Sequence, residues 1–565
     1  MFDELQTVAS NILREKLGTE REIAFTIPER AENGDATTPV ALSLAKELHK
    51  KPHDIASTIA EHLRSSASVE KAEVAGPGYV NIWLTPEALL KELNRSREAA
   101  TVRVKKNEAP VIIDYSAPNI AKPLGIHHIL STVIGQSLMN LYRHMGYAAI
   151  GINHLGDWGT QFGKLAVALK RWGTKPLSEC TLDDLLALYV RFHDEVEKNA
   201  SLEDEGREAF RKIEQGDNEL RTFWLDVVKI TMRELDRLYE RLHVSFDHVH
   251  GESFYEDKMQ PILDEGKKKK VFIEGKEGAL IVEFSEETGL APAIVVKADD
   301  ATIYLTRDLA TARYRIDTFH PQSLLYVVDV AQQYYFRQLF ETLKRLGWDL
   351  PRLEHIYFGR MSFKDKKMST RKGNILKLEE VLDEAVARAE KIIKERGETI
   401  HTDDPAALAE MMGTGAVVYG ILSQNRKMDI VFDWDKMLSF EGNSAPYIQY
   451  THARARSVLR KAAEEGIEIS SKVHIEELSL SERILIRTLL LFPEILADAL
   501  ATHMPHKIAI YLYGLCQDFN AFYNKEPILK APVASRNLRL QLTADTAQIL
   551  KVAASLLTLH VPDRM

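Results

Sequence analysis

The sequence is poor in cysteine and contains no long apolar run. Only two of its 565 residues are cysteines, Cys180 and Cys516, too few for the ligand set of a structural zinc site, so no zinc is expected. No stretch approaches the roughly 20 apolar residues that a membrane helix needs. The early acidic residues Asp3 and Glu4 argue against a transit peptide. These absences favour a protein of the reducing cytoplasm without membrane contact.

An excess of positive charge is also absent. The chain has 73 Lys and Arg against 82 Asp and Glu, a formal net charge of −9. A nucleic-acid partner would therefore have to be held by local basic surfaces, because the overall charge does not attract one. Internal repeats and low-complexity tracts are missing as well. The length suits several domains of ordinary soluble composition.

Hydrophobic patterning divides the chain into three predicted domains. Residues 1–100 are typical of a small α/β module, and residues 108–378 of an α/β domain with a charged helical insertion at about 165–250. Residues 379–565 consist almost entirely of predicted amphipathic helices. The predicted fold class is multidomain α/β plus all-α.

The α/β domain begins with a βαβ pattern. The apolar run 111–115 suits a buried parallel strand, a helix with apolar positions from Leu130 to Met145 follows, and 148–153 forms the next strand. Strand-like runs recur at 324–328 and 355–358. Such units predict a Rossmann-type parallel sheet with its ligand site at the carboxyl ends of the strands.

Two segments on either side of this domain suit phosphate binding. Residues 119–128 (Asn-Ile-Ala-Lys-Pro-Leu-Gly-Ile-His-His) lie between a strand and a helix, where free N–H groups attract anions. Residues 367–373 (Lys-Met-Ser-Thr-Arg-Lys-Gly) follow the last predicted strand and carry three cations. Alone, each segment is more often a helix cap or a solvated loop. Their pairing around one α/β domain favours a nucleotide site.

The pairing resembles the class I aminoacyl-tRNA synthetases, which carry a His-Ile-Gly-His motif after the first strand and a Lys-Met-Ser-Lys-Ser loop after the last. Further segments are similar to the arginyl family over essentially the whole chain. These segments are 114–123, 153–163, 304–308, 432–450 and 561–565. The resemblance implies ATP-dependent attachment of L-arginine to tRNA(Arg) through an arginyl-adenylate, with Mg²⁺ accompanying ATP and a monomeric enzyme.

The resemblance also implies an arginine pocket. A guanidinium needs a carboxylate and planar acceptors, and Asp308 is the natural carboxylate. The implied set is Asn119, Asn153, Tyr304, Asp308 and Gln332. Two alternatives stay open at this point: Asp308 could form an ordinary ion pair with Arg307 or Arg313, and Tyr304 could belong to the core.

For the phosphates, the expected groups are cationic or hydrogen-bonding side chains that follow charge into the transition state. The predicted catalytic residues are Lys122, His127, His128, Lys367, Ser369 and Arg371, and the predicted ATP contacts are Gly125, His128, Lys367 and Met368.

One motif departs from the family pattern. The chain has Gly125-Ile126-His127-His128 where the first histidine and the glycine of the family motif are expected. That glycine normally lets adenine lie against the backbone. We hypothesise that His127 takes over phosphate binding from the missing histidine, at the cost of weaker ATP affinity.

The helical C-terminal part resembles the family's anticodon-binding domain. Tyr447, Gln449, Tyr450 and Arg454 fall on one predicted helix, where aromatic rings can stack on bases and arginine can contact phosphate. The two tyrosines could instead pack a helical core. The first 100 residues resemble the domain that contacts the outer corner of the tRNA, with Asn33-Gly34-Asp35 in its pattern.

Two other functions remain open. The altered 125–128 motif fits a non-catalytic tRNA-binding paralogue, although such a protein has less need of a lysine loop and an arginine pocket. A glutamyl or glutaminyl enzyme would want a cation in the pocket, where this chain places Asp308.

Overall fold

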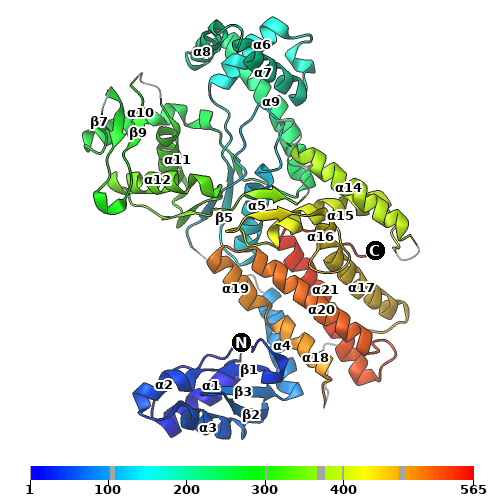
Figure 1. Cartoon of the computed structure of the whole chain (residues 1–565). Coiled ribbons are helices and arrows are strands. Elements are labelled where there is room, and N and C mark those ends of the chain that lie inside the picture. The colour runs from blue at the N-terminus through cyan, green and yellow to red at the C-terminus, as the bar shows by residue number, and fades with distance from the viewer. Residues whose placement is uncertain are drawn as a thin grey trace.

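The computed structural model describes residues 2–101, 108–275, 278–298, 302–364, 376–397, 400–469 and 477–565. The chain forms a small N-terminal module, a central α/β region with two outlying lobes, and a helical C-terminal part (Figure 1). The N-terminal module lies at the far end from the lobe that carries α6, α7 and α8.

The N-terminal module is a three-stranded antiparallel sheet, order β1-β3-β2, with helices packed on it. Its elements are α1 (Asp3–Ile12), β1 (Ala36–Thr38), α2 (Val40–Leu48), α3 (Pro52–Leu63), β2 (Val69–Ala75) and β3 (Tyr79–Leu84). Gly34 precedes β1 with φ +95°, and a Cβ there would lie 2.5 Å from the Ile82 carbonyl oxygen. Glycine is therefore required where the chain passes β3. Helix α4 (Pro86–Thr101) leads out of the module.

A five-stranded, all-parallel sheet forms the centre of the molecule, in the order β11-β10-β4-β5-β6. Its strands are β4 (Val111–Asp114), β5 (Ala149–Asn153), β6 (His248–Val249), β10 (Ser323–Tyr326) and β11 (Arg352–His355). The chain builds the sheet to one side of β4 and then returns to build the other side. The carboxyl ends of β4 and β10 therefore flank a topological switch point, the usual ligand position in such sheets.

The βαβ prediction is confirmed by helix α5 (His128–His144), which joins β4 to β5, and by Gly146 at φ +86° directly after it. The strand predicted at 355–358 begins and ends earlier, as β11. Residues beyond it stay extended, and Phe358 forms an isolated parallel bridge with Asp329.

Two lobes extend from this sheet. The predicted helical insertion contains α6 (Thr160–Trp172), α7 (Leu182–Val196), α8 (Ser201–Glu214) and α9 (Asn218–Arg241), and α9 runs back from the lobe to the sheet (Figure 1). The second lobe contains α10 (Met259–Lys268), β7 (Ile273–Glu274), β8 (Leu280–Val282), β9 (Ala293–Val296), α11 (Tyr304–Phe319) and α12 (Gln333–Arg345).

The C-terminal part is helical, as expected. Its helices are α14 (Leu378–Glu395), α15 (Pro405–Leu422), α16 (Trp434–Met437), α17 (Ala445–Glu464), α18 (Leu480–Leu490), α19 (Phe492–Thr502), α20 (His506–Lys525) and α21 (Val533–Leu556). By length and composition α15 could cross a membrane, but 72% of it is buried inside the protein, which makes it a core helix.

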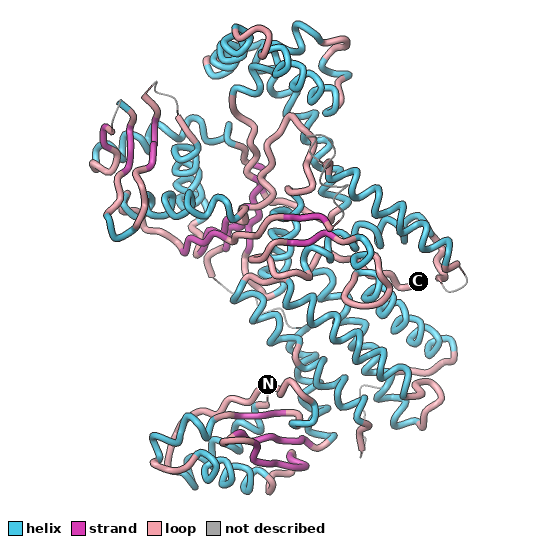
Figure 2. The backbone as a smooth tube through the Cα atoms, in the orientation of Figure 1, coloured by secondary structure: helices cyan, strands magenta, loops and turns pink. Residues whose placement is uncertain are grey.

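One strand interrupts the helical part. β13 (Ile430–Phe432) pairs in parallel with β12 (Met361–Phe363), so two segments almost 70 residues apart share a small sheet near the middle of the molecule (Figure 2). Residues beyond the predicted boundary at 378 thus fold against the region before it.

Candidate active site and candidate tRNA-contact surface

A cavity of about 1320 Å³ opens at the carboxyl ends of β4 and β10. Its wall includes residues from both halves of the sheet and from the first-motif helix. Among them are Asp114, Asn119, His127, His128, Asp308 and Gln332. Segments as far apart in the chain as Asp114 and Leu376 therefore meet at the switch point, where an open parallel sheet binds its ligand.

Two of the carboxylates that line this cavity have raised pKa values. Asp308 on α11 accepts a hydrogen bond from the Tyr335 hydroxyl, and burial raises its pKa to about 6, with the charge of Asp114 acting in the same direction. Burial also raises the pKa of Glu252 to about 7, although Arg307 lies 3.5 Å away. Both groups lack solvation for their negative charge, so the cavity favours a cationic ligand.

Arg307 and Arg313, the two alternative ion-pair partners considered for Asp308, pair with other acids. Arg307 pairs with Glu252, and Arg313 pairs with Asp317 at 2.7 Å. Tyr304, the first residue of α11, is 68% exposed and lines the cavity, so it does not belong to the core. Gln332 lines the cavity from a 3₁₀ turn, Val330–Gln332, before α12.

The two predicted asparagines occupy different positions. Asn119 lines the cavity and lies over Gly156, where a Cβ would approach its Oδ1 to 2.1 Å. Asn153 is fully buried; its Oδ1 accepts from the Ala117 N–H at 3.1 Å and its Nδ2 donates to the Tyr239 hydroxyl at 3.1 Å. The described lining of the cavity does not include Asn153.

The first motif stands at the start of α5. His128 Nδ1 lies 3.0 Å from the Gly125 backbone nitrogen and 3.2 Å from the Gly125 carbonyl oxygen, which leaves Nε2 as the ring nitrogen available to a ligand. Burial lowers the pKa of His128 to about 4, and burial together with the charge of Lys122 lowers that of His127. The two rings lie with centroids 4.0 Å apart, and both line the cavity. Neutral imidazoles at a helix start can donate to phosphate oxygens.

The second motif lies outside the described residues. This applies to Lys367, Met368, Ser369 and Arg371. Residues on both sides of that segment line the cavity, namely Met361 and Ser362 before it and Leu376 after it.

Glu252, Tyr335 and Arg360 are among the lining residues that were not identified from the sequence. Glu252 begins a 3₁₀ segment, Glu252–Lys258, that the hydrophobic pattern does not reveal. Tyr335 lies on α12, in a region where the sequence predicted a helix, but no motif marks it. Arg360 could have been found, because it follows a predicted strand at its carboxyl end. It adds a cation to the same cavity.

A second cavity, of about 820 Å³, lies in the helical C-terminal part and is basic and aromatic. Arg454 on α17 stacks between Tyr450 and Tyr523, at 4.8 and 5.1 Å from their ring centroids. Further cations in the lining are Arg460, Lys461, Lys530 and Arg564. Such a surface suits unpaired bases and phosphates.

The other two residues predicted on this helix face inward. Gln449 is fully buried and donates to the His560 carbonyl at 2.9 Å. Tyr447 is half-buried, and its hydroxyl accepts from Asn520 at 3.1 Å. The core-packing alternative therefore describes Tyr447, whereas Tyr450 lines the second cavity.

Comparison with known proteins assigns each part. The parallel sheet with the first motif at its switch point is the fold of a class I synthetase catalytic domain, because residues 89–434 match the family model of the class I (R) tRNA synthetase catalytic domain. Residues 448–565 match the DALR anticodon-binding domain, and residues 3–84 match the arginyl-tRNA synthetase N-terminal domain.

Similar whole proteins agree with this assignment. The arginine–tRNA ligase of Fusobacterium nucleatum is 38% identical over 96% of each chain, and that of Alkaliphilus metalliredigens is 40% identical over 95% of each. The arginyl-tRNA synthetase structure of Thermus thermophilus has the same fold, with a TM-score of 0.81 at 24% identity over 100% of this chain and 99% of that one. The chain belongs to the arginyl-tRNA synthetase family. Enzymes of this family aminoacylate tRNA(Arg).

Proposed function

We propose that this chain activates L-arginine with ATP in the 1320 Å³ cavity and then transfers it to tRNA(Arg). The observation that carries the proposal is that two poorly solvated carboxylates, Asp308 and Glu252, line the same cavity as the first-motif histidines. A cationic amino acid would neutralise one side of the cavity while its carboxylate attacks the α-phosphate on the other.

Arginine is held by its guanidinium and its α-amino group. We assign Asp308 to the guanidinium, with Tyr304 and Gln332 as further acceptors, because all three line the cavity. Asn119 and Glu252 are assigned to the amino-acid end. Asn153 was predicted as a direct contact; its two hydrogen bonds support a role in holding the loop that carries Asn119.

ATP is held by side chains that donate hydrogen bonds to its phosphates. We assign this role to Lys122, His127 and His128, with Arg360 as a further cation. The predicted contributions of Gly125, Lys367, Met368, Ser369 and Arg371 remain part of the proposal. The low pKa of His128 supports a neutral ring that presents Nε2 to the ligand and accepts no proton near neutral pH.

Mg²⁺ enters this scheme as part of the substrate. Among the described residues no three His, Cys, Asp or Glu side chains gather as ligands for a metal. Mg²⁺ is commonly carried by substrate phosphates with few protein ligands, so we assign it to ATP. Its contribution would be to neutralise charge on the pyrophosphate.

The tRNA would contact the domains at both ends. The basic cavity at Tyr450 and Arg454 suits bases of the anticodon loop, and the module of residues 1–100 suits the outer corner of the tRNA. Residues 108–378 and 379–565 are assigned to catalysis and anticodon binding, respectively. A monomeric, cytoplasmic enzyme completes the proposal, and gel filtration with light scattering would test its oligomeric state.

ATP–pyrophosphate exchange with arginine, run with and without tRNA, tests the activity. Wild type should exchange, and Asp308→Ala should lose at least about 100-fold in kcat/KM, because a desolvated guanidinium then lacks its counter-charge. Asp317→Ala is the matched control, since this acid lies on the same helix but pairs only at the surface with Arg313. Folded wild type that binds tRNA tightly yet never exchanges would indicate a non-catalytic tRNA-binding protein.

A further inference from the structure

The loop between β4 and the first motif is held in an unusual backbone conformation. Ser116, Ala117 and Ala121 have φ of +71°, +45° and +68°, a region that non-glycine residues rarely adopt. Each of these residues donates its N–H to a buried side chain. The acceptors, in the same order, are Ser131 Oγ at 2.9 Å, Asn153 Oδ1 at 3.1 Å and Thr231 Oγ1 at 3.2 Å. Such backbone persists only where its surroundings determine it.

Helix α9 supplies much of that support. Besides Thr231, it contributes Tyr239, whose hydroxyl lies 2.8 Å from Ser116 Oγ and accepts from Asn153 Nδ2 at 3.1 Å. Both side chains are buried, with 0% and 4% exposure. They lie eight residues apart, so they point to the same side of the helix. The loop that bears Asn119 and Lys122 is therefore fastened to α9.

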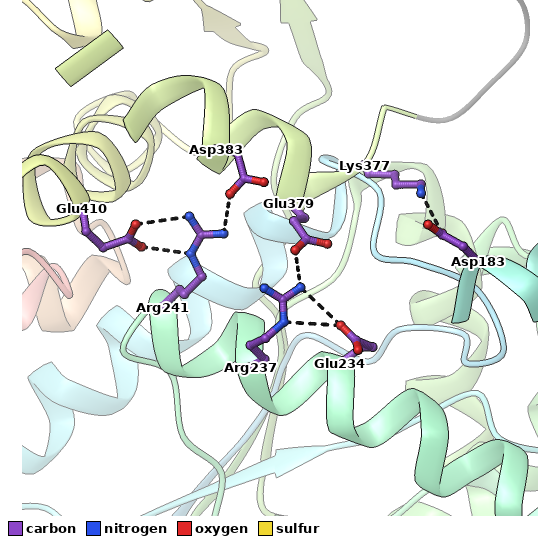
Figure 3. A network of polar contacts seen from close by, with 8 residues as sticks. All are labelled: Asp183, Glu234, Arg237, Arg241, Lys377, Glu379, Asp383 and Glu410. Carbon is purple, nitrogen blue, oxygen red and sulfur yellow. Dashed lines mark hydrogen bonds and ion pairs between the residues drawn. The ribbon is translucent and has the colours of Figure 1, made fainter. Parts of the chain in front are cut away.

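The end of the same helix is tied to α14 and α15 by arginines (Figure 3). Arg241 donates to Asp383 on α14 at 2.8 Å and contacts both carboxylate oxygens of Glu410 on α15, at 2.9 and 3.3 Å. Arg237 bonds Glu379 on α14 and also Glu234 on its own helix, at 3.2 Å. Arg241 is only 18% exposed, so its paired contacts are shielded from solvent more than those of a free surface pair.

Helix α14 begins beside the first motif. Its entry segment bonds the motif through backbone: the Ile126 N–H donates to the Leu376 carbonyl at 2.9 Å, and the Leu378 N–H to that of Leu124 at 2.8 Å. Lys377 also pairs with Asp183 of the insertion at 2.6 Å (Figure 3). The C-terminal half of α9 therefore contacts two elements. One is the 116–122 loop, and the other is α14, the helix that follows the second motif.

We propose that Arg241, with Arg237, is a positioning residue for arginine activation: through α9 it keeps the 116–122 loop in register with the start of α14. The proposal rests on the assigned activation site. Because α15 also packs on α17, which lines the basic cavity, the same contacts connect the tRNA-contact surface to the loop. Loosening them should lower the rate of activation and leave tRNA affinity unchanged.

Exchange kinetics on four proteins test this. Arg241→Gln should lower kcat for arginine-dependent exchange about tenfold or more at saturating substrates, with tRNA affinity in filter binding within about twofold of wild type. Arg241→Lys should recover part of the loss because the charge remains. Arg171→Gln is the matched control: Arg171 contacts both oxygens of Glu205 at 2.7 Å within the insertion, and we expect less than a twofold change.

A double-mutant cycle with Glu410→Gln isolates the interaction. If the two residues act through one contact, Arg241→Gln/Glu410→Gln should be no slower than the slower single variant. A kcat for Arg241→Gln within twofold of the Arg171→Gln control would overturn the proposal, as would losses that multiply in the double variant. Wild type without exchange would instead overturn the assigned activity and, with it, this role for Arg241. Equal thermal midpoints of the variants would show that the kinetic effect is not unfolding.

Discussion

Asp308 and Glu252 show how individual residues prepare this cavity for a cation. Burial raises the pKa of each carboxyl group. Arg307 pairs with Glu252 at 3.5 Å, but the nearby described cations do not fully offset the effect of burial on either pKa. An incoming guanidinium would supply the missing charge. In the proposed function, this cost would favour a basic side chain over a neutral one.

Arginine binding should weaken in acid. The pKa of Asp308, raised to about 6, means that the carboxylate is ionised above pH 6 and neutral below it. Because the guanidinium needs the ionised form, arginine affinity measured by calorimetry should fall as pH drops through 6, by up to about tenfold per pH unit. Affinity that is constant between pH 5 and 7 would contradict this.

The same raised pKa has a consequence for stability that serves as a control. A carboxylate whose folded pKa lies above its unfolded value destabilises the protein progressively as pH rises from about 4 to 6. Asp308→Asn should therefore have a higher free energy of unfolding than wild type at pH 7.5, by on the order of 1–3 kcal/mol, and show no advantage at pH 4.

Gly156 leaves room for the Asn119 side chain, which any larger residue at position 156 would displace. A Cβ there would lie 2.1 Å from Asn119 Oδ1, so Gly156→Ala should push the amide away. We expect kcat/KM for arginine to fall about tenfold while the thermal midpoint changes little, because a mobile side chain can yield. Gly514→Ala is the control, since its Cβ would meet open space and should leave exchange unaltered.

At the scale of elements, helix α17 divides its two faces between packing and a ligand surface. Ile448, Gln449 and His452 are buried, whereas Tyr450 and Arg454 line the basic cavity. The same short stretch of helix therefore packs into the core on one face and lines the cavity on the other. The sequence of α17 did not predict which face packs into the core, because both faces contain polar residues.

Loss of Arg454 should weaken tRNA binding selectively. Arg454→Ala removes a guanidinium stacked on Tyr450 and Tyr523, so we expect the Kd for tRNA(Arg) to rise about tenfold in filter binding, with a smaller dependence on salt. Arg456→Ala, which removes an exposed pair with Asp563, should have little effect. Equal losses in the two variants would show that only general charge matters.

At the scale of the whole molecule, the N-terminal module is fixed to the C-terminal helices by a buried ion pair. Asp35, 1% exposed, contacts Arg483 of α18 at 2.5 Å and accepts from the Leu84 N–H at 2.9 Å. Arg487 of the same helix donates to the Pro28 carbonyl at 2.6 Å. The Asn33-Gly34-Asp35 segment, noted in the sequence only as a family pattern, thus joins the two ends of the chain.

Breaking this pair should detach the module. Asp35→Ala leaves Arg483 without its buried partner, a change that typically costs about 3–5 kcal/mol. We expect an earlier unfolding transition in calorimetry and a several-fold higher KM for tRNA, with arginine and ATP constants at saturating tRNA close to wild type. Glu70→Gln removes only the exposed partner of Arg483 and should change neither. A single unaltered transition in Asp35→Ala would refute the docking role.

The sequence by itself determined the secondary structure of the sheet region, the parallel arrangement that the βαβ pattern requires, and the two motif segments. These depend on local periodicity and on residue chemistry, which can be read from consecutive positions. Asp308 followed from the family resemblance of the 304–308 segment together with the chemistry of a guanidinium, and the structure places it in the cavity wall. Its contact with arginine stays a prediction.

Only the tertiary structure decided which side chains reach the cavity. Glu252, Tyr335 and Arg360 enter it, Asn153 turns inward to hold a strained loop, and α9 ties that loop to α14 through Arg241. These roles depend on packing between segments far apart in the chain, such as Ala117 with Asn153, 36 residues apart, and Arg241 with Asp383, 142 residues apart. A periodic pattern carries no information about such distances, because it specifies which face of an element is buried and leaves open what that face meets.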